Sequence, residues 1–403
     1  MKHLRFGYLT GPVLGVLWTF VLAVTVAVAM SFATGEAFRP SLIWSVIFGI
    51  PTGLALVWRG TALIAAGVLV GVYVVALTLG VGPVLTGNAS TLARIVAALF
   101  MGIGIGWPLK VFVEELSMGA LTRHEFEDAV IRTLKGFGYI FFTAIVVIPF
   151  YVMVMTSLKN QAQLMQNPLD FSIDLTQGWG LFRSYVELMT EFNFGTYMWT
   201  SFYISVLTVL ITLLFAIPGA YAVARLRFRG QAAFSRSILL IYMVPMIVLA
   251  LPIYIAFSMM GLRNSIVGIV MIYPVTTIPV ALYMLQGYFR GLPSEVEEAG
   301  LMDGLSRLQV IWKITLPLSL PALASVSLYV FMIAWNEFLL AFMLLDDPSK
   351  FTLTRGIASL NSSEIPRQHL MAGSVIATVP IMALFLGLEK FMTKGLTAGS
   401  VKG

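Results

Sequence analysis

Long apolar stretches, separated by short polar segments, repeat along almost the whole chain of 403 residues. A run of about 20 apolar residues can cross a bilayer as an α-helix, because a helix satisfies every backbone polar group internally. We therefore predict an all-α membrane protein with about ten transmembrane helices. The predicted spans are 7–33, 42–58, 61–80, 92–112, 137–157, 197–224, 238–260, 266–288, 322–345 and 370–392.

The composition supports this prediction, because 59% of the residues are apolar and only 11% are charged, against about 25% charged residues in soluble domains. The net charge of +6 could suggest a nucleic-acid partner. With both termini placed in the cytoplasm, however, most of the Lys and Arg residues fall on the cytoplasmic side of the predicted spans, which is typical of membrane proteins. We expect membrane lipid around the chain, no nucleic acid, and a first apolar run that is retained, because it is too long for a cleavable signal.

One polar segment, residues 289–321, lies between two predicted spans and has the pattern of two short helices. Capping boxes at Ser294 to Glu297 and Ser306 to Gln309 can each satisfy the free amides of a helix start. Between them, Asp303-Gly304 can end the first helix, because Gly adopts the left-handed conformation that closes a helix. The pattern predicts a helix-turn-helix outside the bilayer.

Within this segment the chain reads Glu298-Ala299-Gly300, three residues, Gly304, nine residues, Ile314, one residue, Leu316-Pro317. This spacing resembles the signature of permease subunits in binding-protein-dependent ABC importers. The resemblance implies that the first short helix is a coupling helix that docks on a cytoplasmic ATPase, with Glu298 at the contact and Gly304 at the bend. Gly300 replaces the usual Ala, which lowers helix propensity by about 1 kcal/mol. The candidate coupling residues are Glu297, Glu298, Ala299, Gly300, Asp303, Gly304, Ile314, Leu316 and Pro317.

From about residue 136 onward, the chain resembles the six-helix permease core of the maltose-type carbohydrate importers. Further matches are Ser157-Leu158-Lys159, Ala220 to Arg225, Ala334 to Phe338 and Lys394 to Gly403. The resemblance implies a type I importer permease core at 136–403, preceded by a four-helix membrane extension at 1–113 and a charged cytoplasmic linker at 114–135. The role of residues 1–135 is left open.

The same resemblance implies several partners. They are a second permease subunit, two ATP-binding cassette ATPase subunits, and an extracytoplasmic sugar-binding protein touched by the loop 159–196, which could otherwise be a solvated connector. The chain contains no G-x-x-x-x-G-K-[ST] motif, so it is expected to be a transport subunit and not an enzyme. It has no Cys and no metal-ligand spacing of His, so we expect no cofactor or metal. The expected location is a bacterial or archaeal cytoplasmic (inner) membrane, with both termini cytoplasmic.

Trp335, Asn336 and Glu337 form the main polar cluster well inside a predicted span. An ionisable group at membrane depth is costly and therefore a functional candidate. A carboxylate and an amide could hydrogen-bond sugar hydroxyls while an indole covers the ring, so these residues could line a substrate pathway. They could equally bond neighbouring helices and lock the bundle.

Two other functions are possible. An ion-coupled secondary transporter of a small polar solute would be expected to carry several acidic or His residues inside its spans, and this chain has few. A membrane scaffold would fit the nearly uncharged first four spans, but would not explain the segment 289–321. We therefore favour a permease subunit of a carbohydrate ABC importer.

Overall fold

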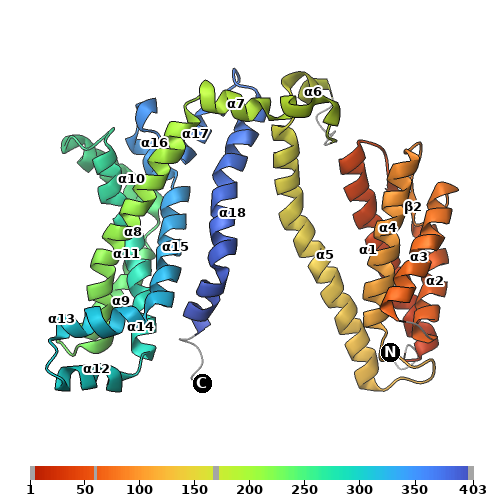
Figure 1. The fold of residues 1–403 in the computed structure, drawn as a ribbon, viewed down its shortest axis with the longest axis horizontal. Helices are drawn as coiled ribbons and strands as arrows, with labels where there is room; N and C mark the ends of the chain where they lie inside the picture. The colour runs from red at the N-terminus through yellow and green to blue at the C-terminus, as the bar shows by residue number, and fades with distance from the viewer. Residues whose placement is uncertain (1–4, 59–60, 167–171, 398–403) are drawn as a thin grey trace. The chain divides into compact units, whose positions relative to one another are not determined.

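The computed structural model describes residues 5–58, 61–166 and 172–397. The chain forms two compact units (Figure 1), here called the N-terminal unit (Met1–Leu181) and the C-terminal unit (Phe182–Gly403). Over these described residues both units are helical, apart from the short antiparallel pair β1 (Arg39–Pro40) with β2 (Val84–Leu85) and an isolated bridge between Phe6 and Ala120. The prediction of a helical membrane protein is confirmed.

The N-terminal unit is built from two tightly packed helix pairs and one long helix. α1 packs on α2 and α3 packs on α4, while α5 packs against α1 and α4. The helices are α1 (Gly7–Thr34), α2 (Leu42–Trp58), α3 (Ala62–Thr78), α4 (Thr91–Phe112), α5 (Arg123–Ser157) and α6 (Gln161–Gln166), followed by the 3₁₀ helix η2 (Leu175–Phe182).

Glycines set the close approach within the two helix pairs. A Cβ at Gly53 of α2 would collide with the backbone of Gly11 in α1. In the second pair, a Cβ at Gly102 of α4 would lie 2.5 Å from the Cα of Val70, and one at Gly106 would lie equally close to Ala66. Gly102 and Gly106 therefore serve the close packing of α4 against α3.

The charged segment expected to be a linker is largely ordered secondary structure. α5 begins at Arg123 and is started by a capping box between Thr122 and Glu125, so the expected domain boundary at residue 135 falls inside one continuous helix. The reason is local: the capping box satisfies the first amides, and no Pro lies between Arg123 and the apolar part of the helix, where Pro149 is the first.

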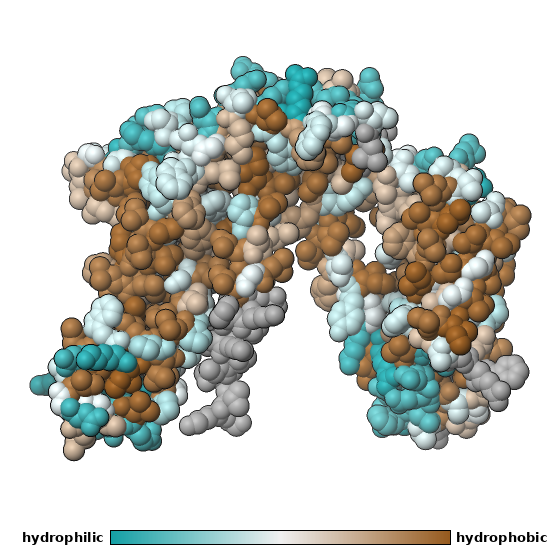
Figure 2. Space-filling view, viewed as in Figure 1, coloured by the Kyte–Doolittle hydropathy of each residue, from teal (hydrophilic) through white to brown (hydrophobic). Residues whose placement is uncertain are grey.

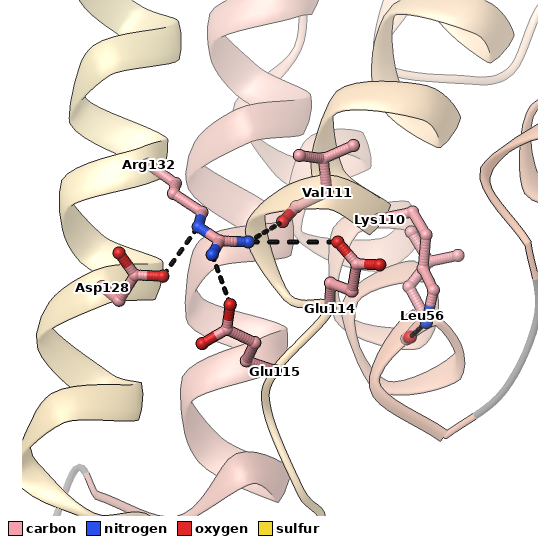
Figure 3. A network of polar contacts seen from close by, with 7 residues as sticks. All are labelled: Leu56, Lys110, Val111, Glu114, Glu115, Asp128 and Arg132. Atoms are coloured by element: carbon pink, nitrogen blue, oxygen red, sulfur yellow. Dashed lines mark hydrogen bonds and ion pairs between the residues drawn. The ribbon is translucent and has the colours of Figure 1, made fainter.

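Arg132 connects this part of α5 to the end of α4 (Figure 3). Its guanidinium lies 2.5 Å from the Glu115 carboxylate and 2.7 Å from the Asp128 carboxylate, and it donates to the carbonyl of Val111 at 3.1 Å. Glu114 lies at the edge of the same group, at 4.0 Å. One cation thus holds the connection between α4 and α5 in a fixed conformation.

The C-terminal unit is a helical bundle in which α8 packs against α11 and α15, and α15 packs against α18. Its first helices are α7 (Arg183–Thr190), α8 (Phe194–Arg225), α9 (Gln231–Tyr242), α10 (Met246–Met259) and α11 (Ile266–Gly291). After the segment described in the next section follow α15 (Leu320–Asn336), α16 (Leu339–Leu344), η4 (Pro348–Lys350), α17 (Leu353–Ser359) and α18 (Arg367–Thr397).

Two predicted spans are not single helices. The span 238–260 is interrupted between α9 and α10 at Pro245, which lacks an amide hydrogen and disfavours helix in the residue before it. The span 322–345 ends as α15 at Asn336, and α16 begins at Leu339. Over the described residues, six helices are long and apolar enough to cross a membrane, and a seventh candidate is a pair bent by 80°.

The surface of each unit has the polarity of a membrane protein (Figure 2). Brown, apolar side chains cover the middle of the helices, and teal, polar ones gather at their ends. Large residues in the middle of α8, such as Leu214 and Phe215, are more than half exposed. Such side chains are stable only against lipid or another apolar surface.

The contact between α1 and α2 generates a stability prediction. Gly53→Ala places a methyl group against the Gly11 backbone and should cost about 1–3 kcal/mol. Gly67→Ala in α3 is the matched control, because a Cβ there meets nothing within 4 Å and Ala favours the helix. Thermal unfolding in detergent should show a lower midpoint for Gly53→Ala only; equal midpoints for both variants would contradict the packing argument.

Candidate functional site

The segment between α11 and α15 consists of a short helix, a glycine turn, and a second helical stretch made of three consecutive short elements. α12 (Ser294–Met302) is followed by Gly304 at φ 85°, and then by α13 (Arg307–Val310), the π-helical turn η3 (Ile311–Thr315) and α14 (Leu316–Leu318). Figure 1 places α12 to α14 at one end of the C-terminal unit, with α7 and α17 at the other. The helix-turn-helix predicted from the sequence is confirmed, and we call it the coupling segment.

The turn at Gly304 is a Schellman motif. The Gly304 amide donates to the Leu301 carbonyl at 3.1 Å, and the Leu305 amide donates to the Gly300 carbonyl at 3.1 Å. These bonds satisfy carbonyls that the helix end leaves free, and they require a left-handed residue at position 304. The sequence correctly placed the end of α12 at Asp303-Gly304.

Of the two predicted capping boxes, only the second forms. The Gln309 amide donates to the Ser306 hydroxyl at 3.3 Å, and the Ser306 amide donates to the Gln309 carboxamide at 2.8 Å. The first prediction was wrong, because Ser294 is already the first residue of α12 and Pro293 occupies the cap without a side-chain bond. Glu297, which would have closed that box, turns inward instead.

The Glu297 side chain of α12 is buried against two other elements, α8 and η3. Its carboxylate accepts a hydrogen bond from the Tyr221 hydroxyl at 3.2 Å and another from the Thr315 hydroxyl at 3.0 Å. The Arg225 guanidinium forms an ion pair with it at 3.5 Å. Sequence reasoning noted Tyr221 and Arg225 only as part of a family-like stretch, and it missed Thr315, because nothing local predicts contacts across such sequence separations.

The opposite face of the coupling segment points outward. Glu298, Ala299 and Asp303 are exposed, and so are large apolar side chains that the sequence did not single out. The three most exposed of them are Met302 at 87%, Leu308 at 69% and Trp312 at 67% exposure. A polar segment with such exposed hydrophobic side chains has the chemistry of a contact surface, and their occurrence in an otherwise polar loop was the available sequence signal.

Gly300 lies where the second half of the segment packs against α12. A Cβ at this position would lie 2.5 Å from the Cδ1 atom of Ile314 and 3.6 Å from the Cγ2 atom of Val310. Because Cδ1 is the far end of a flexible side chain, an alanine at position 300 requires only a shift of the Ile314 side chain. Leu316 and Pro317 lie in α14, just before the 80° bend that leads into α15.

Glu337 lies in the break between α15 and α16. Its carboxylate accepts hydrogen bonds from the amides of Leu340 at 2.8 Å and Ala341 at 3.1 Å, which caps α16. Its carbonyl accepts a bond from the Thr354 hydroxyl at 2.6 Å. The group is half-buried, and most of its hydrogen-bonding capacity is used by the protein.

The two residues before Glu337 point in different directions. The Trp335 indole is buried and donates to the Ala377 carbonyl of α18 at 3.1 Å. The Asn336 side chain is exposed and donates to the Met332 carbonyl of its own helix at 2.9 Å. The predicted cluster is therefore not one polar surface, because α15 ends between Asn336 and Glu337.

The described residues of the loop 159–196 form the short helices α6, η2 and α7. α7 in this loop is tied to α18 through Glu187, whose carboxylate lies 2.7 Å from the His369 ring nitrogen and 2.6 Å from the Arg183 guanidinium. The hydrogen bond from Arg183 lowers the pKa of Glu187. His369 lies in the first turn of α18. Residues 167–171 of this loop and residues 398–403 of the C-terminal match lie outside the described residues.

Comparisons with known proteins agree with this geometry. Residues 216–397, which include the coupling segment, match the family described as "Binding-protein-dependent transport system inner membrane component". The inner membrane ABC transporter permease protein YcjP of Escherichia coli K12 is 36% identical over 279 residues, which are 68% of this chain and 98% of that protein. The chain belongs to this family of ABC transporter permeases. It is a transport subunit and not an enzyme.

Two further comparisons fit the assignment. The trehalose/maltose transport system permease protein MalG of Thermococcus litoralis is 33% identical over 69% of this chain and 99% of that protein. A solved structure of a bacterial ABC transporter involved in the import of the acidic polysaccharide alginate has a TM-score of 0.57 at 23% identity, covering 67% of this chain and 98% of that chain. The fold is thus that of an ABC importer permease, while about a third of this chain lies outside each alignment.

The left-handed turn generates a prediction for the coupling segment. Gly304→Val should destabilise the turn by at least the roughly 1–2 kcal/mol that an L-residue loses in this conformation, because no atom crowds the position and only the backbone angle matters. Gly304→Asn is the matched variant, since Asn tolerates this region. Limited proteolysis should cut the segment faster in Gly304→Val than in Gly304→Asn; identical rates would show that the φ angle is not the constraint.

Proposed function

We propose that this chain is one permease subunit of an ATP-driven importer that translocates a carbohydrate delivered by an extracytoplasmic binding protein. The carbohydrate class is supported by the names of relatives, which include trehalose/maltose and diacetylchitobiose transport systems. The full assembly would contain a second permease subunit and two ATP-binding cassette ATPase subunits. The observation that carries the proposal is the coupling segment, with its fixed turn and its outward face.

The outward face of the coupling segment fits an ATPase groove. Met302, Leu308 and Trp312 supply apolar area, and Glu298 and Asp303 add negative charge beside it. Apolar side chains at the centre and charges around them are the usual arrangement of protein interfaces. Glu298 is then the acidic contact, and Gly304 sets the angle between α12 and α13.

We assign the coupling segment to the cytoplasmic side of a bacterial or archaeal inner membrane, with both termini on that side. The excess of Lys and Arg on this side supports the orientation. The proposed organisation keeps a four-helix extension at 1–113, a polar connection at 114–135 and a permease core at 136–403, with ten spans in total. The polar connection and the first core span are parts of the same helix, α5.

Transport would require the core to alternate between two conformations. Closure of the ATPase dimer would push the coupling segment, and the bundle would change from inward-facing to outward-facing as the loaded binding protein docks on the loop 159–196. Such coupling requires one two-state element that both partners influence. The helix breaks at Pro245 and Glu337 are places where the bundle can bend without losing long runs of hydrogen bonds.

For the substrate pathway we propose a limited role for the cluster at 335–337. Asn336 has an exposed amide and could contact a sugar hydroxyl, whereas Trp335 and Glu337 position the helices around it. The ion-coupled alternative is not favoured. It would require free carboxylates inside the spans, and the Glu337 carboxylate is already bonded to two backbone amides.

The docking assignment predicts the effect of reversing one charge. Glu298→Arg should reduce co-purification of the ATPase and ATP-dependent uptake about tenfold or more, because a repulsive charge would face the groove. Glu295→Arg, an equally exposed substitution in the first turn of the same helix, is the control and should have a smaller effect. Uptake of radiolabelled maltose, trehalose and diacetylchitobiose by reconstituted vesicles measures the result; full activity of Glu298→Arg would contradict the assignment.

The pathway assignment is tested at Asn336. Asn336→Ala removes an exposed amide without breaking a contact between elements, so it should raise KM for the transported sugar at unchanged assembly. Asn361→Ala, outside the predicted spans, is the matched control. If KM for all three sugars is the same in both variants, Asn336 lies outside the pathway.

A further inference from the structure

We propose that Glu297 is a positioning residue that fastens the coupling helix α12 to the C-terminal end of α8, so that movement of the docked segment is transmitted directly to α8. The inference rests on the proposed docking function. It assigns the two neighbouring glutamates opposite tasks: Glu298 is exposed and would face the ATPase, and Glu297 is buried and faces α8.

The contacts of Glu297 come from two separate elements, α8 and η3. Tyr221 of α8 donates to one carboxylate oxygen, and Thr315 of η3 donates to the other. The Arg225 guanidinium, one helical turn beyond Tyr221, supplies the opposite charge. A single side chain of α12 therefore joins the end of α8 to the segment that leads into α15.

The end of α8 also holds the backbone that enters α12. The Arg225 Nη2 atom donates to the carbonyl of Leu292 at 2.6 Å, two residues before the helix begins. The same guanidinium thus contacts both the approach to α12 and the Glu297 carboxylate. Because two separate points are held, α12 is restrained from rotating about the chain that leads into it.

The π-helical turn brings Thr315 into position. Thr315 is fully buried at the end of η3, and its carbonyl accepts a bond from the Ser319 hydroxyl at 2.6 Å. A π-turn adds one residue to a helical turn and so rotates the side chains that follow it. The buried hydroxyl then meets the carboxylate, and the second half of the segment is joined to the same connection.

Burial makes this connection resist separation. Glu297 has 7% of its surface exposed, and a buried carboxylate that loses its donors is strongly unfavourable. Moving α12 away from α8 would separate the Glu297 carboxylate from Tyr221 and Arg225, whereas moving both helices together preserves these contacts. The lower-cost response to a push on α12 is therefore a joint movement with α8.

α8 can carry that movement to the opposite end of the C-terminal unit. It is 32 residues long, and near its other end the Ser201 hydroxyl accepts a bond from the Leu353 amide of α17 at 2.7 Å, where both groups are buried. Figure 1 shows α8 running from the level of α12 to that of α17. The connection at Glu297 thus links the coupling segment to the end where α7 lies.

The test uses the whole complex, assembled from this chain, its partner permease, ATPase and binding protein in lipid nanodiscs. The chain has no Cys, so Gly195→Cys provides a single nitroxide site in the first turn of α8, at a position where an added Cβ meets nothing within 4 Å. MgATP with vanadate is the probe. The readouts are the change in the nitroxide spectrum and the amount of ATPase that co-purifies.

Glu297→Gln, Tyr221→Phe and Thr315→Val each remove part of the connection. In Glu297→Gln we expect ATPase binding to stay within about twofold of the parent while the spectral response falls at least threefold. Combining Glu297→Gln with Tyr221→Phe should add little, because both changes affect one connection. Glu295→Gln, an exposed glutamate in the same helix, should leave both readouts unchanged.

Two results would overturn the proposal: a parent-like spectral response in Glu297→Gln, or an ATPase loss equal to that of Glu298→Arg, which would make Glu297 a docking contact. If Glu297→Gln fails to assemble, Tyr221→Phe decides in the same way, because it removes one hydroxyl and no charge. Failure of the docking function gives a different result, namely full ATPase binding by Glu298→Arg, and leaves the response of Glu297→Gln interpretable.

Discussion

A bilayer offers no hydrogen-bonding partner to backbone amides and carbonyls, so every such group of this chain at membrane depth must find one within the protein. This constraint explains the long helices, and it also explains the places where helices stop. α15 ends at Asn336, and the Glu337 carboxylate satisfies the amides of α16 that the break would otherwise leave free. The position of Glu337 in a predicted span suggested a sugar contact, but the first role of its carboxylate is to accept hydrogen bonds from backbone amides of α16.

Buried charged groups, like buried backbone groups, also need partners, and Glu297 in the coupling segment is an example. Glu297 and Glu298 are adjacent and chemically identical, yet one is surrounded by Tyr221, Thr315 and Arg225 and the other is in contact with solvent. The helical rotation of about 100° per residue separates them onto different faces. One face of α12 is therefore part of the bundle, and the other is free to meet a partner.

The N-terminal unit is stabilised in a different way, by close contact between helix backbones. Gly11 and Gly53 let α1 and α2 approach closely, and Gly102 and Gly106 do the same for α4 against α3. Apolar side chains gain little from each other in lipid, so helix association depends on this kind of fit. Together with the Arg132 group at the start of α5, the glycine contacts make the N-terminal unit a firmly packed body.

The sequence alone determined the features that depend on neighbouring residues. Apolar length gave the helices, the Ser306 to Gln309 box gave the start of α13, and Gly304 gave the end of α12, because caps and turns depend on a few adjacent residues. It also determined the family, through fixed spacing in one loop.

What it could not determine depends on residues far apart in the chain. Ser294 was expected to cap α12 with Glu297, but the donors of Tyr221 and Thr315, 76 and 18 residues away, hold that carboxylate. Gly300 was noted only for its low helix propensity, and the folded chain shows that the Ile314 side chain packs over it. Local sequence fixes the helix ends, whereas the direction in which a buried polar group points is decided by whichever partner the folded chain brings within bonding distance.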